Sequence, residues 1–578
     1  MKNLIFKRAV FLSDTQRSAN QFVFHKKYNL ITGGKDHSAG KTSLVKSLLW
    51  GLGCQPHDIP DSWKALDCKS YIECDIGGNE CIIYRYQNTI KLSVNGEPFK
   101  TFPKITGNYS SAFASLVGFS VLLPNRPSKE EDPELETPPP AYYFLPFYID
   151  QKKGWSEVWN GFDSLGQYSD WKRTVIKFHT GYLPPEHFDL EEEIYDFKKK
   201  EAVAQNEVKR IDTALAVVDE YVPKTNFTIN EEEFERITDE VKGTLQNLSS
   251  EQEIILSDLS NSTAERYHLG SQMELLAEAA LELEEDYKFS VENIDGDELE
   301  CPLCGTHHDN TIIDKAEILA DKKQLESQSE SIRKKIRTID RNISDLNIRL
   351  SEIRDQINTI NQKYSINDLD GNKGNLSNIV DSLASNSVKK NVSRTKEEKQ
   401  LESKKASDKQ RDLKKEQRKL LTKTDKDDRN EFFMSRLESH ISKLSASGVS
   451  LNAVKSPIDH KKLLRDGGAA ESTRAILAYH ASVMDMIKAF GSELLSPFIV
   501  DTPRQHEQND ISYKSIIELI MNRIPTEQQV FLCALDDPVI SDFKNKAKVI
   551  TLNNKTKLLG DGNYEELRKE LDRVIRPD

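Results

Sequence analysis

Residues 29–50 hold a glycine loop that ends in a lysine and a hydroxyl residue, a combination that binds phosphate. Residues 29–32 predict a short buried strand, and residues 44–50 predict an amphipathic helix. In such a loop, backbone N–H groups and the helix N-terminus surround phosphates, and we expect Lys41 on the β- and γ-phosphates of ATP and Thr42 on Mg²⁺. The candidate nucleotide-binding residues are Gly34, Ser38, Ala39, Gly40, Lys41, Thr42 and Ser43.

The spacing of this loop differs from the usual phosphate-binding loop by one residue. Counting back from Gly40, the first glycine should fall at position 35, which is Lys35, and Gly34 stands one residue further away. An ordinary strand, turn and helix is the alternative interpretation of this segment taken alone.

Three other places carry polar residues suited to the same chemistry. Gln151 ends an aromatic run that predicts a strand over residues 142–149, and Asp501 ends an apolar strand over 497–500. A glutamine there can bond a Mg²⁺-bound water and the γ-phosphate region, and an aspartate at a strand end is typical of a Mg²⁺ site; a plain exposed glutamine is the alternative. Gly467 and Gly468 open an apolar helix whose free N–H groups could bind a γ-phosphate from a second subunit.

A CxxC motif, Cys301 and Cys304, lies near the middle of the chain. It offers two zinc ligands, whereas a structural zinc site has four. The same motif of a second molecule could complete the site by two-fold symmetry. An intrachain site with His307 and His308, or no metal at all, are the alternatives. A redox role would need a thioredoxin-like βαβ context, which is absent.

The elements around this motif are long helices. Apolar residues alternate at spacings of four and three over more than four heptads, which predicts a coiled coil. These positions are Ile332, Ile336, Ile339, Ile343, Leu346, Leu350, Ile353, Ile357, Ile360 and Tyr364. Breaks at 221–226 and 367–374 lie at similar distances from the CxxC motif, as expected of an antiparallel coiled coil with a paired joint.

Residues 389–423 are basic, with fourteen lysines and arginines against six acidic residues. Such a run is often only a solvated helix face. The run also predicts contact with the phosphate backbone of double-stranded DNA, and such contact does not depend on the DNA sequence.

Composition limits the other possibilities. The 578 residues are 30% charged and 37% apolar, with a net charge of −13, so any nucleic-acid site must be a local patch. No run of about 18 apolar residues occurs, which argues against a membrane span. Seven cysteines and no signal-peptide pattern place the chain in the cytoplasm. Residues 70–100 predict an antiparallel meander. Cys68, Cys74 and Cys81 fall in or beside its strands and are expected to be buried or half-buried thiols, with a metal site as the alternative.

Taken in order, these features resemble the SMC/SbcC-type ABC ATPases over the whole chain. Within that superfamily, SAGKTSLVKSLLW, YIDQKKGW and FIVDTPRQ are similar to the SMC-like ATPases of bacterial antiphage systems such as Lamassu. The resemblance implies an α/β ATPase head with a long antiparallel coiled-coil hairpin capped by a zinc hook. The expected parts are the head halves 1–185 and 441–578, the arms 186–298 and 311–440, and the apex 299–310.

The resemblance also implies activity and partners. ATP would lie between the heads of a homodimer that is also joined at the zinc hook by Cys301 and Cys304. Mg²⁺ would be held by Thr42, Gln151 and Asp501. A nuclease effector, a small accessory subunit and DNA would be the other partners of this DNA sensor. An SbcC-type repair ATPase working with a nuclease, or a structural tether that uses nucleotide only to dimerise, are the alternatives.

The sequence departs from the family pattern at three places. The family has a catalytic glutamate after the strand aspartate, but Thr502 stands here, and Gln505 and Glu507 do not match by position. Asp466 replaces the serine before the glycine pair, and residues 535–537 lack the usual switch histidine. We therefore expect ATP binding with slow hydrolysis.

Overall fold

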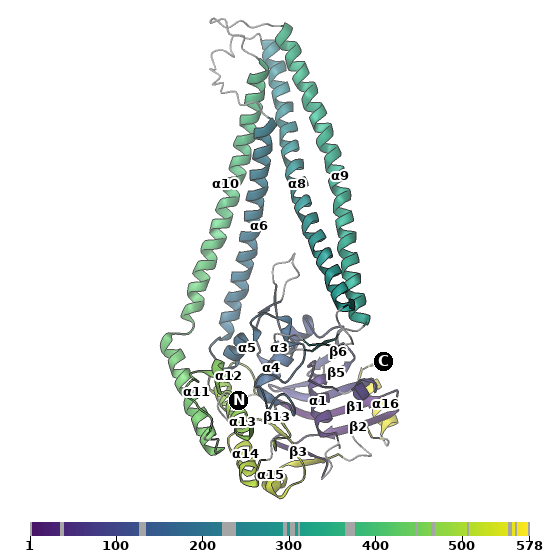
Figure 1. The fold of residues 1–578 in the computed structure, drawn as a ribbon, viewed down its shortest axis with the longest axis vertical. Helices are drawn as coiled ribbons and strands as arrows, with labels where there is room; N and C mark the ends of the chain where they lie inside the picture. Colours follow the sequence, from purple (N-terminus) through teal and green to yellow (C-terminus); the bar gives the residue numbers. More distant parts are fainter. Residues whose placement is uncertain are drawn as a thin grey trace. The chain divides into compact units, whose positions relative to one another are not determined.

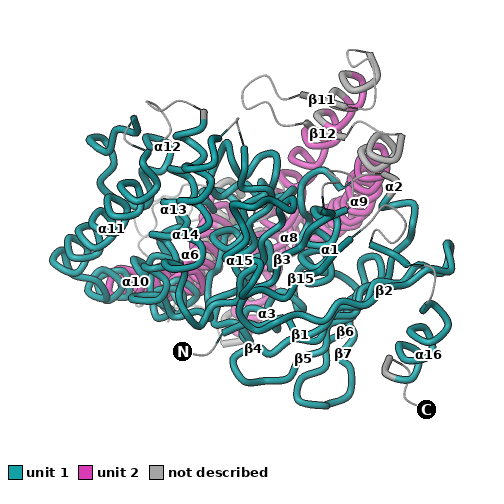
Figure 2. The backbone as a smooth tube through the Cα atoms, turned by 90° about the horizontal axis from the view of Figure 1, so that it is seen from below, with its two compact units in different colours: residues 1–127, 132–193, 413–578 teal, residues 128–131, 194–412 magenta. Residues whose placement is uncertain are grey.

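The structure, a computed structural model, divides the chain into two compact units. The first comprises residues 1–127, 132–193 and 413–578, and the second comprises residues 128–131 and 194–412 (Figure 2). Both ends of the chain therefore build the first unit. The residues described are 3–34, 40–59, 61–125, 134–221, 239–292, 298–300, 307–309, 312–363, 376–446, 448–463, 469–505, 508–552, 558–560 and 563–575.

A five-stranded parallel sheet forms the centre of the first unit. Its strand order is β10 (Tyr148–Ile149), β13 (Phe498–Asp501), β14 (Val530–Cys533), β3 (Tyr28–Thr32) and β15 (Lys548–Thr551). Every residue of β13 and β14 is buried, as expected of parallel strands covered on both faces. Because all neighbouring pairs are parallel, the carboxyl ends of these strands meet at one edge.

A six-stranded antiparallel sheet forms the second layer of this unit. Its order is β2 (Ser18–Val23), β1 (Leu4–Ser13), β4 (Cys68–Ile76), β5 (Asn79–Tyr86), β6 (Thr89–Val94) and β7 (Lys100–Phe102). The predicted meander is present, and Asn95 and Gly96 both have positive φ at the turn between β6 and β7. Cys68, Cys74 and Cys81 are buried free thiols, as predicted.

Helices pack against both sheets of the first unit (Figure 1). The C-terminal helix α16 (Tyr564–Ile575) places Leu567 and Leu571 in a cluster with Val10 and Leu12 of β1. The others are α1 (Lys41–Gly51), α2 (Asp61–Lys64), α3 (Asn108–Val117), α4 (Ala141–Phe144), α5 (Trp171–His179), α11 (Lys423–Lys443), α12 (His460–Leu463), α13 (Ala469–Phe490), α14 (Asp510–Asn522) and α15 (Ser541–Lys546). Two short strands, β8 (Leu123–Pro124) and β9 (Leu135–Glu136), pair with each other.

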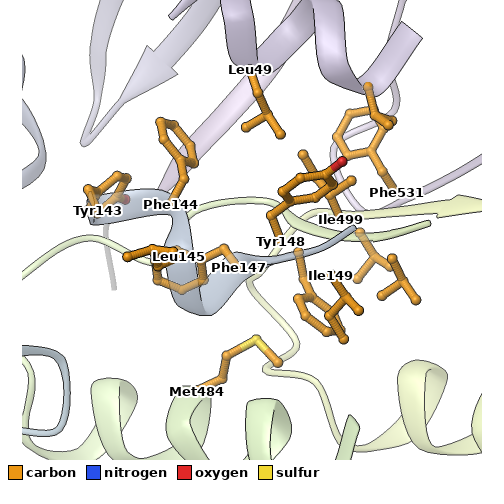
Figure 3. Packing of buried hydrophobic residues seen from close by; sticks show 14 of the residues in the cluster. Leu49, Tyr143, Phe144, Leu145, Phe147, Tyr148, Ile149, Met484, Ile499 and Phe531 are labelled. Carbon is orange, nitrogen blue, oxygen red and sulfur yellow. The ribbon is translucent and has the colours of Figure 1, made fainter. Parts of the chain in front are cut away.

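The aromatic run before Gln151 is not the strand that we predicted. It forms the helical turn α4 and a 3₁₀ turn over Leu145–Phe147, and only Tyr148–Ile149 join the sheet as β10. Tyr143, Phe144 and Phe147 are fully buried in the core of the unit (Figure 3). A run in which every side chain is buried lacks the alternation of a half-buried strand, so periodicity cannot distinguish strand from helix.

Four long helices account for most of the second unit. They are α6 (Pro185–Tyr221), which begins in the first unit, α8 (Asp239–Glu292), α9 (Ile312–Lys363) and α10 (Leu376–Lys419). Helices α8 and α9 lie side by side (Figure 1). Ion pairs join Arg266 to Asp340 and Glu284 to Lys322, so the two helices run antiparallel.

The heptad positions of α9 face α8, as predicted. One cluster contains the buried Leu346, Leu350, Ile353 and Ile357 of α9 and four apolar residues of α8, which are Leu248, Ile255, Leu256 and Leu259. The earlier heptad positions Ile332, Ile336 and Ile339 are half-buried, and Tyr364 lies outside the described residues.

A small β-hairpin flanks the CxxC motif. Strands β11 (Glu298–Glu300) and β12 (His307–Asp309) are antiparallel, and Glu300 lies opposite His307. Cys301 and Cys304 themselves lie outside the described residues. Within the described ranges, no three His, Cys, Asp or Glu side chains are grouped so that they could hold a metal ion. No helix in those ranges is long and apolar enough to cross a membrane.

Candidate nucleotide-binding site

Helix α1 begins directly after strand β3 and the glycine loop. Its N-cap, Gly40, has a φ of 88°, a backbone conformation that favours glycine. No side chain caps this helix end, and its first turn contains no acidic residue. The N–H groups at the start of α1 therefore suit an anion. Ser38 and Ala39, predicted to lie in the same loop, are outside the described residues.

Gly34 lies at the other end of the loop. Its φ is 64°, its N–H donates to Oγ1 of Thr32 over 3.2 Å, and its carbonyl accepts from the N–H of Asp536 over 2.9 Å. Lys41 is 7% exposed and lies at the first position of α1. The described part of the loop thus ends on both sides at glycines with positive φ.

Thr42 and Gln151 meet at the carboxyl edge of the parallel sheet. Oγ1 of Thr42 donates a 2.9 Å hydrogen bond to Oε1 of Gln151. Thr42 comes from the first turn of α1, and Gln151 follows β10 two residues after the strand ends. The structure therefore brings together two of the three residues predicted to hold Mg²⁺.

Asp501, the third residue, is fully buried at the end of β13. Its Oδ1 accepts from the Thr502 hydroxyl over 3.0 Å, whereas its buried Oδ2 has no hydrogen-bond partner. Burial raises the pKa of Asp501 to about 6, and the negative charge of Asp150 contributes to this rise. A buried carboxylate oxygen without a partner is costly unless something else compensates it.

These residues fit a magnesium ion. Thr42, Gln151 and Asp501 offer hydroxyl, amide and carboxylate oxygens, the ligand types that hard divalent cations take. The unpartnered Oδ2 of Asp501 is the oxygen that a cation would compensate. A cavity of about 210 Å³ adjoins Thr42 and Gln151 and extends along α1 past Lys46 and Ser47 to Trp63.

The turn that carries Gln151 is held at both ends. Oδ2 of Asp150 accepts from the N–H groups of Lys152 and Lys153 over 2.9 and 3.1 Å. The indole Nε1 of Trp155 donates to the Asp501 carbonyl over 2.8 Å. A Cβ at Gly154 would lie 2.3 Å from the Asp150 nitrogen, so only glycine fits there.

Thr502, which directly follows Asp501 at the end of β13, has an unusual backbone. Its φ is 51°, which is strained for a β-branched residue. Its N–H bonds the Cys533 carbonyl over 3.0 Å, and the Gln505 amide donates to the Thr502 carbonyl over 2.8 Å. Gln505 thus braces this turn, and Glu507 lies outside the described residues.

The structure describes some of the remaining predicted site residues and not others. Gly467 and Gly468 lie outside the described residues, and helix α13 begins directly after them at Ala469. Ser43 lies in the first turn of α1 and lines the cavity. Sequence reasoning missed Lys46 and Asp150, although the acidic residue directly before Gln151 was a visible signal.

The chain is similar over nearly its whole length to two proteins that are named Lamassu protein LmuB. The chain is 21% identical to the Lamassu protein LmuB of Bacillus cereus (strain VD014), covering 99% of this chain and 98% of that protein. It is 22% identical to the Lamassu protein LmuB of Bacillus sp. (strain NCIM 5461 / CCTCC AB 2011126 / NIO-1130), with 95% and 96% covered. No protein-family model matches the chain.

Among solved structures, the chain is similar to an Smc head domain with a coiled coil and joint from Pyrococcus yayanosii. The identity is 15%, the TM-score is 0.36, and 98% of this chain and 100% of that chain are covered. A likeness at this TM-score adds nothing to the functional assignment.

Proposed function

We propose that this chain, a homologue of the Lamassu protein LmuB over its full length, is an SMC-family ATPase of a Lamassu defence system. In this proposal it senses DNA, and engagement of two heads upon ATP binding controls a partner nuclease. The convergence of Thr42, Gln151 and the half-partnered Asp501 next to the N-terminus of α1 is the observation that carries the ATPase assignment.

Each residue of the site would have its own role in binding ATP and Mg²⁺. Lys41 and the N–H groups at the start of α1 bind and orient the phosphates of ATP. The oxygens of Thr42, Gln151 and Asp501 hold Mg²⁺, which, when bound, neutralises phosphate charge. Gly467 and Gly468 of a second copy would complete the site across the two heads.

A nucleotide-gated tether is the second candidate, and Thr502 favours it. A threonine cannot act as the carboxylate base that the family uses at this position. ATP would then hold two heads together with little turnover.

The partners follow from the same proposal. One face of α10 holds Ala406 and Gln410, which are buried, and Gln410 bonds Glu201 of α6 over 2.6 Å. Lys404, Lys405 and Lys409 are exposed and suit the backbone of double-stranded DNA. Cys301 and Cys304 from two copies would hold zinc in an intermolecular hook. A nuclease effector and a small accessory subunit would complete the complex.

Nucleotide binding and turnover of the purified chain, with and without double-stranded DNA, test the proposal. We expect Mg²⁺-dependent ATP binding and a slow hydrolysis that DNA increases. Binding without any hydrolysis would favour the tether, and a protein that binds no ATP would overturn both candidates.

A further inference from the structure

A buried ion pair lies directly behind the Gln151 turn. Nζ of Lys46, from the second turn of α1, is 3.3 Å from Oδ1 of Asp150. The two side chains are 8% and 0% exposed. Lys46 also donates to the His57 carbonyl, and the Tyr148 hydroxyl donates to Asp150 over 2.9 Å. Neither charge therefore depends on solvent for compensation.

Both members of this ion pair lie close in sequence to a candidate magnesium ligand. Asp150 is the residue before Gln151, and its second carboxylate oxygen fixes the N–H groups of Lys152 and Lys153. Lys46 lies one helical turn after Thr42 on α1, so the ion pair joins the two elements that carry Thr42 and Gln151. At the far end of the turn, Trp155 bonds the Asp501 carbonyl.

We propose that Lys46 and Asp150, assisted by Trp155, are positioning residues that hold Gln151 against Thr42 and Asp501 for Mg²⁺ binding. The inference rests on the proposed ATPase function and adds the residues that preorganise its cation site. A rigid turn lowers the ordering cost of binding, since Gln151 does not have to be recruited from solvent. Groups that orient metal ligands commonly change metal affinity by about 10- to 100-fold when they are replaced.

The test compares the affinity for a fluorescent ATP analogue in Mg²⁺ with the affinity in EDTA. The ratio of the two affinities is the Mg²⁺-dependent gain. Full-length Lys46→Met and Asp150→Asn proteins should keep their affinity in EDTA within about twofold and lose about tenfold of the Mg²⁺-dependent gain. Lys46→Arg, which keeps the charge, should restore most of it. Trp155→Phe removes the indole N–H and part of the ring but leaves both charges in place. It should give a smaller loss, which keeps the test open if the charge variants fail to fold.

Lys27→Met is the matched control. Nζ of Lys27 donates to the carbonyls of Pro525 and Gln528 over 2.8 and 3.1 Å, next to the opposite end of β3. This variant should lower the melting temperature without changing the Mg²⁺-dependent gain. The inference is overturned if Lys46→Met and Trp155→Phe behave in the same way as Lys27→Met. A wild-type protein without any Mg²⁺-dependent gain would instead overturn the proposed function.

Discussion

The hydroxyl of Thr42 donates a 2.9 Å hydrogen bond to the side-chain oxygen of Gln151, although the two residues are 109 positions apart. The contact exists because β10 and β3 belong to one parallel sheet and both end at the same edge. Asp501 ends a third strand of this sheet, so three separate segments bring side-chain oxygens to one place.

Replacing Lys41 by alanine should abolish ATP binding. Lys41 opens α1 at the end of the loop, and no acidic residue in the first turn of α1 competes with phosphate there. Isothermal titration with ATP and Mg²⁺ measures the effect, and the exposed Lys26→Ala variant is the control. Retained binding in Lys41→Ala would show that the loop assignment is wrong.

Asp501→Asn should stabilise the protein in EDTA, and more so at higher pH. Burial raises the pKa of Asp501 to about 6, so the folded state binds a proton more readily than the unfolded state. The wild type therefore loses stability as pH rises from about 4 to about 6, by up to about 3 kcal/mol in total. Denaturant unfolding of both proteins at pH 4.5 and 7.5 measures this difference.

Asp150→Asn should change the stability of the protein in the direction opposite to Asp501→Asn. Burial raises the pKa of Asp150, but Lys46 and backbone N–H groups lower it more, so the pKa lies below its ordinary value. Its charge stabilises the fold above the unfolded-state pKa, and that stabilisation is lost on acidification. Asp150→Asn should therefore destabilise the protein at pH 7.5. The same direction of change in both variants would contradict the assigned environments.

ATP turnover should be slow and insensitive to the Thr502 hydroxyl. We expect a turnover below about 1 s⁻¹, the lower end of typical enzymes, because position 502 offers no carboxylate. Thr502→Ala removes the hydroxyl that bonds Asp501 and relieves the β-branched strain, and it should leave the rate within about threefold of the wild type. Phosphate release measures turnover, and a large loss in this variant would give Thr502 a direct role.

Replacing Lys404, Lys405 and Lys409 by glutamine should weaken DNA binding equally for all sequences. Each lost phosphate contact reduces the slope of log affinity against log salt by about 0.9. The same change at Lys323, Lys334 and Lys335 of α9 is the control for charge alone. Fluorescence anisotropy at several salt concentrations reports the slope, and equal effects of both triple variants would remove α10 as the specific contact.

The metal content of the Cys301→Ser/Cys304→Ser double variant tests the zinc hook. Wild-type protein should contain one zinc per two chains, and the variant should lose both zinc and pairing through the apex. His307→Ala/His308→Ala is the control and should keep its zinc. One zinc per chain that disappears in the histidine variant would favour the intrachain alternative.

Local patterns in the sequence were enough to predict the segments that act over short distances. Strand β3 and helix α1 follow from a buried run, a glycine loop and an apolar stretch. Residues 44–51 of α1 are buried on every face, however, so this helix is not the amphipathic one that we predicted. The turn at Asn95 and Gly96 needs positive φ, which these residues tolerate. The heptad spacing of Leu346, Leu350 and Ile353 indicated which face of α9 packs against α8. Each of these features is encoded within a few residues of chain.

The tertiary structure decided what depends on distant segments. Residues 142–147 are helical because the surrounding core buries them on all sides, which no local alternation reveals. Gln151 and Asp501 were predicted from their places at the ends of strands, but their meeting with Thr42 depends on strand order in the sheet. The pairing of Lys46 with Asp150 depends on the packing of α1 beside β10. Sequence sets the residue types at each position, whereas long-range packing sets which of them share a buried environment and therefore which charges compensate one another.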